Sequence, residues 1–201
     1  VRKRGRATKP GRVRILLAAL CLATSCSIGC GPAPNERRPA EPAEPSWAEQ
    51  ADAVRTGLSD TIRLDRTQVT DEDLKLLDGL NSKLRRVNLS HTGITDAGLA
   101  RLCEIDQLVQ LRLSSPQVTD AGLACVAQLA NLRFLHLLDM PITDAGLEHL
   151  HGLANLESLY LDRTAVTDEG LARLLEALPD VHLHIDEHHH PLDPRAADHQ
   201  H

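Results

Sequence analysis

The stretch that decides the fold is residues 142–165, ITDAGLEHLHGLANLESLYLDRTA. Its first six residues, Ile-Thr-Asp-Ala-Gly-Leu, have close copies at 118–123 (Val-Thr-Asp-Ala-Gly-Leu) and at 166–171 (Val-Thr-Asp-Glu-Gly-Leu). Another copy occupies residues 94–99. Repetition at a fixed spacing of this length is typical of a solenoid, in which each repeat buries its apolar face against its neighbours.

The repeats extend over residues 59–185, and each is about 24 residues long. Five copies begin, in order, at Ser59, Leu84, Leu108, Leu132 and Leu156, and a partial sixth covers residues 181–185. Period-two alternation in segments such as Leu159-Tyr160-Leu161 predicts a strand with leucines on one face. Leu147, Leu150 and Leu153 recur at helical spacing, so we expect a helix after each strand.

The pattern L-x-x-L-x-L-x-x-T-x-I-T-D-x-G-L-x-x-L resembles the leucine-rich repeat family. It is most similar to the subclass with Thr or Cys at the usual Asn position, which is found in bacterial secreted proteins and in F-box-associated repeats. The resemblance implies an α/β fold, a leucine-rich-repeat solenoid. In that fold a parallel sheet lines the concave side of an arc and helices cover the convex side.

A Thr-Asp pair stands between strand and helix in each complete copy. We interpret these pairs as helix N-caps, with the Asp at the positive helix end, rather than as catalytic or metal-binding groups. The predicted cap residues are Thr95, Thr119, Thr143 and Thr167. A glycine follows each of them at the third position, which suggests that neighbouring turns approach too closely there for a side chain. These glycines are Gly98, Gly122, Gly146 and Gly170.

Both ends of the array need a cover, because a terminal repeat otherwise exposes its apolar face. Residues 46–49, Ser-Trp-Ala-Glu, form a capping-box pattern. Apolar residues follow at helical spacing, at Trp47, Ala51, Val54 and Leu58. We therefore expect an N-terminal capping helix in segment 46–58, with Trp47 lying over the first repeat.

The N-terminus reads as an export signal in residues 1–30. Residues 1–14 carry seven Lys or Arg, and residues 15–23 are an apolar run too short to span a membrane as a helix. Cys26 and Cys30 follow small residues in a pattern that resembles a bacterial lipobox, so either is a candidate for lipidation. Residues 31–45 hold five of the eleven prolines and predict a disordered spacer.

The charge distribution narrows the class of partner. The formal net charge is −6, and removing the seven basic residues of the leader from the 22 leaves 15 against 28 acidic ones. Such an acidic product is a poor electrostatic partner for nucleic acid. We therefore expect a protein or another macromolecule as partner, with membrane contact only through a lipid anchor, at the envelope of a bacterial cell.

Chemistry-bearing motifs are few. We find no nucleophile motif, phosphate-binding loop or zinc signature, so we predict no enzyme activity, no catalytic residue, no metal site and no cofactor. Cys103 and Cys125 are not expected to form a disulfide framework. The segment 186–201 is His-rich and predicts a flexible tail, and an alternative function is metal binding at this end.

The outward positions of the predicted strands are the candidate binding surface. The only Phe and the only Tyr of the chain both fall there, and aromatic, Arg and His groups are common in protein-binding hot spots. The candidate binding residues are Arg112, Phe134, His136, Leu138, Tyr160, His182 and His184. The histidines predict binding that is sensitive to acid near pH ~6.5. Drift on a tolerant surface is the competing interpretation.

The resemblance also leaves a second function open, that of an adaptor presenting substrates to a ubiquitin ligase. Such adaptors carry an F-box before their repeats. Residues 1–58 instead predict a signal, a spacer and one helix, which disfavours that role. We expect an exported, non-enzymatic binding module.

Overall fold

The computed structural model describes residues 45–65, 68–186 and 188–189, all within the compact unit formed by residues 44–201. The predicted signal peptide, most of the spacer, Cys26, Cys30 and most of the His-rich segment lie outside the described residues. In the described part, no helix has the length and apolar character needed to cross a membrane.

The described strands form one sheet in chain order. Six of them are parallel: β1 (Thr61–Arg63), β2 (Arg86–Leu89), β3 (Gln110–Leu113), β4 (Phe134–Leu138), β5 (Ser158–Asp162) and β6 (His182–Ile185). The short strand β7 (His188–His189) pairs with β6 in the antiparallel direction. Residues 188–189 therefore extend the sheet, whereas the sequence predicted a free tail there.

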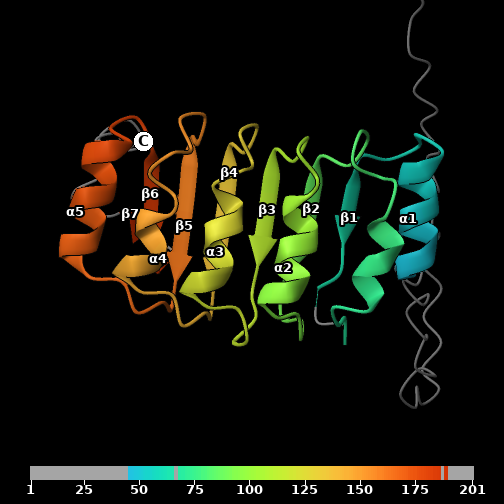
Figure 1. Cartoon of the computed structure of the whole chain (residues 1–201), viewed down its shortest axis with the longest axis horizontal. Coiled ribbons are helices and arrows are strands. Elements are labelled where there is room, and N and C mark those ends of the chain that lie inside the picture. The colour runs from blue at the N-terminus through green and yellow to red at the C-terminus, as the bar shows by residue number, and fades with distance from the viewer. Residues whose placement is uncertain (1–44, 66–67, 187, 190–201) are drawn as a thin grey trace, which may run out of the picture. The chain divides into compact units, whose positions relative to one another are not determined.

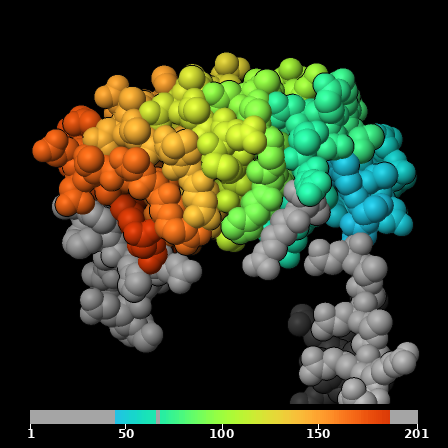
Figure 2. Space-filling view, turned by 90° about the horizontal axis from the view of Figure 1, so that it is seen from below, coloured from blue at the N-terminus to red at the C-terminus, as the bar shows by residue number. Residues whose placement is uncertain are grey.

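Helical segments follow the first five strands and lie on one face of the sheet, as Figure 1 shows. They are η1 (Asp73–Leu77, a 3-10 helix), α2 (Asp96–Cys103), α3 (Asp120–Val126), α4 (Asp144–Glu148) and α5 (Asp168–Ala177). In Figure 2 the repeats stack as successive slabs in chain order. The α/β repeat architecture predicted from the 24-residue period is confirmed.

The core lies between the sheet and the helices. Leu111, Leu135 and Leu159 occupy the same register position on β3, β4 and β5, and each has no exposed surface. From the helical side, Leu147 and Leu150 are equally buried. Each slab thus contributes a few aliphatic side chains to one continuous core, which explains how a domain almost without aromatic residues folds.

The N-terminal cover is α1 (Trp47–Arg55), and its predicted capping box is present. Ser46 accepts from the Glu49 amide, and the Glu49 carboxylate accepts from the Ser46 amide at 2.7 Å. The Trp47 indole donates to the carbonyl oxygen of Asp73 at 3.0 Å, so the ring lies over the first repeat as expected. The Gln50 side chain hydrogen-bonds the backbone of the edge strand β1: it accepts from the N–H of Arg63 and donates to the C=O of the same residue.

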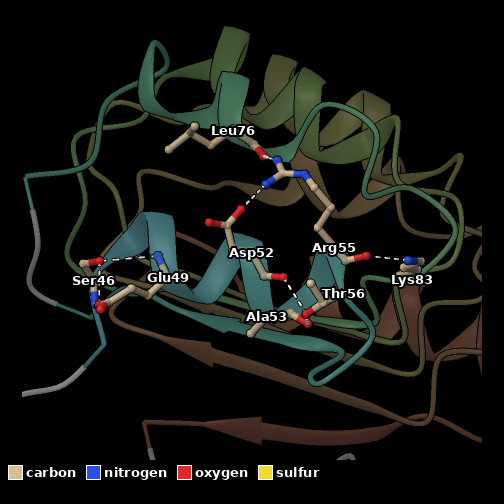
Figure 3. A network of polar contacts seen from close by, with 8 residues as sticks. All are labelled: Ser46, Glu49, Asp52, Ala53, Arg55, Thr56, Leu76 and Lys83. Atoms are coloured by element: carbon tan, nitrogen blue, oxygen red, sulfur yellow. Dashed lines mark hydrogen bonds and ion pairs between the residues drawn. The ribbon is translucent and has the colours of Figure 1, made fainter.

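The far end of α1 is tied to the first repeat by polar contacts (Figure 3). Arg55 bonds Asp52 and the carbonyl oxygen of Leu76, and Lys83 donates to the carbonyl oxygen of Arg55 at 2.5 Å. The expectation for Leu58 is wrong, because this side chain is 86% exposed. The helix ends at Arg55 and Gly57 turns the chain with φ 79°, so position 58 no longer shares the helix face.

The Thr-Asp pairs form a ladder from repeat to repeat, which the sequence did not predict. The Asp96 carboxylate accepts from both the amide and the hydroxyl of Thr119, each at 2.8 Å. The same two bonds join Asp71 to Thr95, Asp120 to Thr143 and Asp144 to Thr167. We call these four pairs the Asp–Thr ladder.

Two sequence predictions at this ladder can now be judged. The N-cap bond is present at Thr95, Thr143 and Thr167, while Thr119 stands at the N-cap position without accepting an amide bond. The predicted close approach at the repeated glycines is confirmed. A Cβ on Gly122 would lie 2.2 Å from the Asp96 Oδ1 atom, so the missing side chain makes room for the carboxylate of the preceding repeat.

The expectation that Cys103 and Cys125 form no disulfide framework is wrong. The two residues form a disulfide between the last turn of α2 and α3, with their Cα atoms 5.8 Å apart. That separation is typical of disulfides. Stacking of consecutive repeats brings the two helices side by side, so residues 22 positions apart in sequence become neighbours.

Candidate functional site

The open face of the sheet, opposite the helices, carries one side chain per strand at a common level. The register aligns Arg63 with Asn88, Asn88 with Arg112 and onward along the sheet. The full row, which we call the open-face row, is Arg63, Asn88, Arg112, His136, Tyr160 and His184. This register agrees with the outward placement that the strand alternation predicts for Arg112, His136, Tyr160 and His184.

Three rings of this row stack on one another. The rings of His136 and Tyr160 have their centroids 4.0 Å apart with planes 5° from parallel, and Tyr160 and His184 are 4.1 Å apart at 5°. The rings of His182 and His184 are nearly perpendicular, with their centroids 4.4 Å apart. Neighbouring strands about 4.8 Å apart suit such stacking. We call His136, Tyr160 and His184 the ring stack.

The predicted site residues are less exposed than the sequence suggested. Arg112, Phe134, His136, Tyr160 and His184 are partly buried, while Leu138 is 9% and His182 is 8% exposed. Stacking covers the ring faces. Leu138 is buried together with its register partner Asp162, which is also only 8% exposed. A partner would therefore meet ring edges and the partly exposed Phe134.

The environment of His136 also changes its acid–base behaviour. Burial, with a smaller contribution from the positive charge of Arg112, lowers the pKa of His136 to about 4, although Asp162 acts in the opposite direction. The imidazole is therefore neutral at neutral pH and over the range near pH 6.5. The expectation that His136 charges near pH ~6.5 is wrong, because the stack removes much of its ring from water.

The other half of the open face, over β1–β3, is polar and hollowed. A depression of about 200 Å³ is lined by the polar residues Thr61, Arg63, Arg86, Asn88, Gln110 and Arg112, together with Ile62 and Val87. Of these residues the sequence analysis selected only Arg112. The others also occupy alternate strand positions on this face, but nothing in the pattern indicates that long side chains from three strands enclose a common space.

Metal chemistry has no visible basis in the described part of the chain. No three His, Cys, Asp or Glu residues there are grouped so that they could hold a metal ion. His182 and His184 pack through their rings, and most of the remaining His-rich segment lies outside the described residues.

Comparisons with known proteins agree with this architecture. Residues 80–103 match a protein family described as Leucine Rich repeat. A comparison with curated proteins gave no match. Among solved structures, an internalin from Listeria monocytogenes is similar, with a TM-score of 0.54 and 23% identity over 68% of this chain. The alignment covers 37% of the internalin, so this chain spans well under half of its length.

A second similar structure is internalin C2 of Listeria monocytogenes, with a TM-score of 0.42 and 21% identity over 66% of this chain and 80% of that one. At 23% identity, the similarity to the first internalin bears on the fold alone. Six parallel strands alternate with helices on one face, and residues 80–103 carry the family pattern. The chain therefore has the α/β fold of a leucine-rich-repeat solenoid.

Proposed function

We propose that this chain is an exported, non-enzymatic binding module that recognises another protein through the open face of its sheet. The observation that carries the proposal is the gathering of the chain's only Phe and only Tyr there, with Tyr160 at the centre of the ring stack. A core built almost wholly from aliphatic residues has no need of these rings. Aromatic groups beside an arginine are typical of interface hot spots.

The arrangement suits recognition rather than catalysis. The ring stack presents parallel edges at fixed spacing, because each ring is held between its neighbours or at the end of the row. Phe134 lies two residues before His136 on β4, and the Arg133 guanidinium is 5.5 Å from the centroid of its ring. Rigid aromatic groups contribute contact area with little loss of side-chain entropy on binding, which favours a protein interface.

Export is supported by two independent features. The basic, apolar and small-residue order of residues 1–30 is that of a secretory signal. The Cys103–Cys125 disulfide suits an oxidising compartment outside the cytosol. We further propose that Cys26 or Cys30 is lipidated and that residues 31–45 separate the repeats from the membrane.

Photo-crosslinking at two positions tests the binding surface. A photoreactive phenylalanine analogue replaces Phe134 on the open face or, as a matched control, the exposed His149 after α4 on the helical side. In intact bacterial cells we expect position 134 to label one distinct envelope protein and position 149 to leave that protein unlabelled. Equal labelling from both positions, or labelling from 149 alone, would contradict recognition by the open face.

Mass spectrometry of the mature protein tests export and anchoring separately. We expect an acylated N-terminal cysteine at position 26 or 30 and a Cys103–Cys125 bridge in the unreduced sample. A soluble product that begins at another residue near this point would contradict the anchor while leaving export in place. A chain that keeps residues 1–23 in the cytosol would contradict both.

A further inference from the structure

Two arginines on the open face form no ion pair among the described residues, unlike two other arginines of this chain. Arg86 pairs with Asp60 at 3.1 Å, and Arg133 makes two bonds to Glu157, at 2.6 and 2.8 Å. Within the described part of the chain, neither Arg63 nor Arg112 has such an ion pair. The Nε atom of Arg112 is buried and has no hydrogen-bond partner there, which is costly for a charged donor.

Asn88 lies between these two arginines in the register and is oriented by its own strand end. Its Oδ1 atom accepts from the amide of Ser90 at 3.1 Å and from the Ser90 hydroxyl at 2.7 Å. Because a backbone amide only donates, these bonds identify the oxygen of the Asn88 side chain and leave its NH2 group for other partners. Arg63, Asn88 and Arg112 thus present donors alone.

The spacing of these donors fits one small anion. Arg63 and Arg112 are two strands apart, so their backbones are separated by roughly 10 Å. Both side chains line the same depression of about 200 Å³. Arg86 lines it too, but its charge is already matched by Asp60. A carboxylate offers only acceptors and matches the planar guanidinium fork.

We propose that Arg63, Asn88 and Arg112 form a carboxylate-binding site for an acidic side chain of a partner protein. The inference rests on the proposed function and extends it by naming the chemistry of the ligand. The site stands beside the ring stack, since Arg112 is the register partner of His136. One extended segment of the partner reaches both, with its acidic residue at the arginines and an apolar residue at the rings.

The distance between the two contacts gives the spacing of the ligand residues. Asn88 on β2 and Tyr160 on β5 are three strands apart, which corresponds to roughly 14 Å. An extended peptide advances about 3.3 Å per residue, so this span corresponds to about four residues. Side chains four residues apart in an extended segment point the same way, so both reach the sheet together.

Three peptides test the proposal by titration against the full chain. The first contains Ser-Glu-Ser-Ser-Ser-Phe-Ser, the second replaces its Glu by Gln, and the third replaces the same Glu by phosphoserine. We expect the Glu peptide to bind at least about tenfold more tightly than the Gln peptide. In NMR spectra, its addition should shift the Nε–Hε resonance of Arg112.

Variants of the protein locate the effect. R63Q and R112Q should each weaken the Glu peptide about tenfold and leave the Gln peptide nearly unchanged. R112K keeps the charge but loses the fork, and should fall between R112Q and the unmodified chain. The matched control is R85Q, because Arg85 is exposed, has no ion pair among the described residues and does not line the depression. Thermal melts confirm that each variant is folded.

The outcomes separate this inference from the proposed function. Equal binding of the Glu and Gln peptides, no binding of any peptide, or an equal loss in R85Q would overturn the carboxylate site. Tight binding of the phosphoserine peptide alone would overturn it in favour of a phosphate site. If F134A weakens all three peptides while R63Q and R112Q weaken none, the open face binds protein but not through a carboxylate.

Discussion

The Asp–Thr ladder and the open-face row run along the same stack of repeats at the same spacing, yet they differ in one respect. The ladder repeats the same pair of bonds four times, from Asp71–Thr95 to Asp144–Thr167. The open-face row instead changes at nearly every strand, from arginine to asparagine to stacked rings. Positions that repeat serve the contact between slabs, and positions that vary are free for recognition.

The first repeat supports this distinction between repeated and variable positions. It has no repeat before it to contact, and it also lacks the glycine that the later repeats share. Asp73 stands where the later repeats have glycine. In those later repeats the glycine leaves room for the carboxylate of the preceding slab, as Gly98 does for the carboxylate of Asp71. The first repeat follows α1 and has no such carboxylate to accommodate. The glycine is therefore a requirement of stacking and not of the helix itself.

The largest expected effect comes from blocking the ladder. Gly170→Ala places a Cβ 2.2 Å from Oδ1 and 2.3 Å from Cγ of Asp144, so the carboxyl group must move and its bonds to Thr167 break. We expect the free energy of unfolding to fall by about 3 kcal/mol. Denaturant unfolding measures it. Gly152→Ala is the control, since a Cβ there meets nothing within 4 Å, and a loss as large as that of Gly170→Ala would contradict the explanation.

A smaller effect is expected at the centre of the ring stack. Tyr160→Ala removes both stacking contacts of a partly buried ring, and we expect a loss of about 2 kcal/mol in unfolding free energy. Tyr160→Phe keeps the stack and should stay near the unmodified chain. The open-face row would then contribute to stability as well as to recognition. Unchanged unfolding of Tyr160→Ala would show that the rings serve recognition alone.

A single ladder threonine should matter less. Thr143→Ala removes the bond from its hydroxyl to Asp120 and the N-cap bond from the Ala145 amide, for a loss of about 1.5 kcal/mol. Thr119→Ala is the matched variant, because Thr119 bonds Asp96 but makes no cap bond. The unfolding free energy of Thr119→Ala should therefore fall by less, and the difference is the contribution of the N-cap bond. Peptide binding by both variants should be unchanged, and lost binding at full stability would place recognition in these turns.

The effect that is smallest at neutral pH is a pH dependence at His136, because it develops only as the pH falls below 6.5. Folding lowers its pKa from 6.5 to about 4, so between these values the unfolded chain binds a proton that the folded chain does not. The free energy of unfolding should therefore fall as the pH falls from 6.5 towards 4. His136→Gln should flatten this dependence relative to the unmodified chain, whereas His149→Gln should not. If the unfolding free energy of His136→Gln varied with pH as that of the unmodified chain does, the pH dependence would not come from His136.

Much of this molecule could be predicted from its sequence because the same local pattern of residues recurs in each repeat. The 24-residue period, the strand alternation, the N-caps and the capping box at Ser46 all depend on residues near one another in sequence. The close approach at the glycines joins adjacent repeats, but the recurrence of glycine at one position made it predictable. Agreement among copies separates such signals from chance. The order of the open-face row follows directly from the same period.

Other features were decided only when the slabs stacked. The Cys103–Cys125 disulfide, the acceptance of two Thr119 bonds by Asp96, the ring stack and the depression at Arg63 and Arg112 all join residues of different repeats. The lowered pKa of His136 depends on burial by its neighbours. A period predicts which positions align, but contact distance, burial and charge depend on how side chains of adjacent slabs fill the space between them.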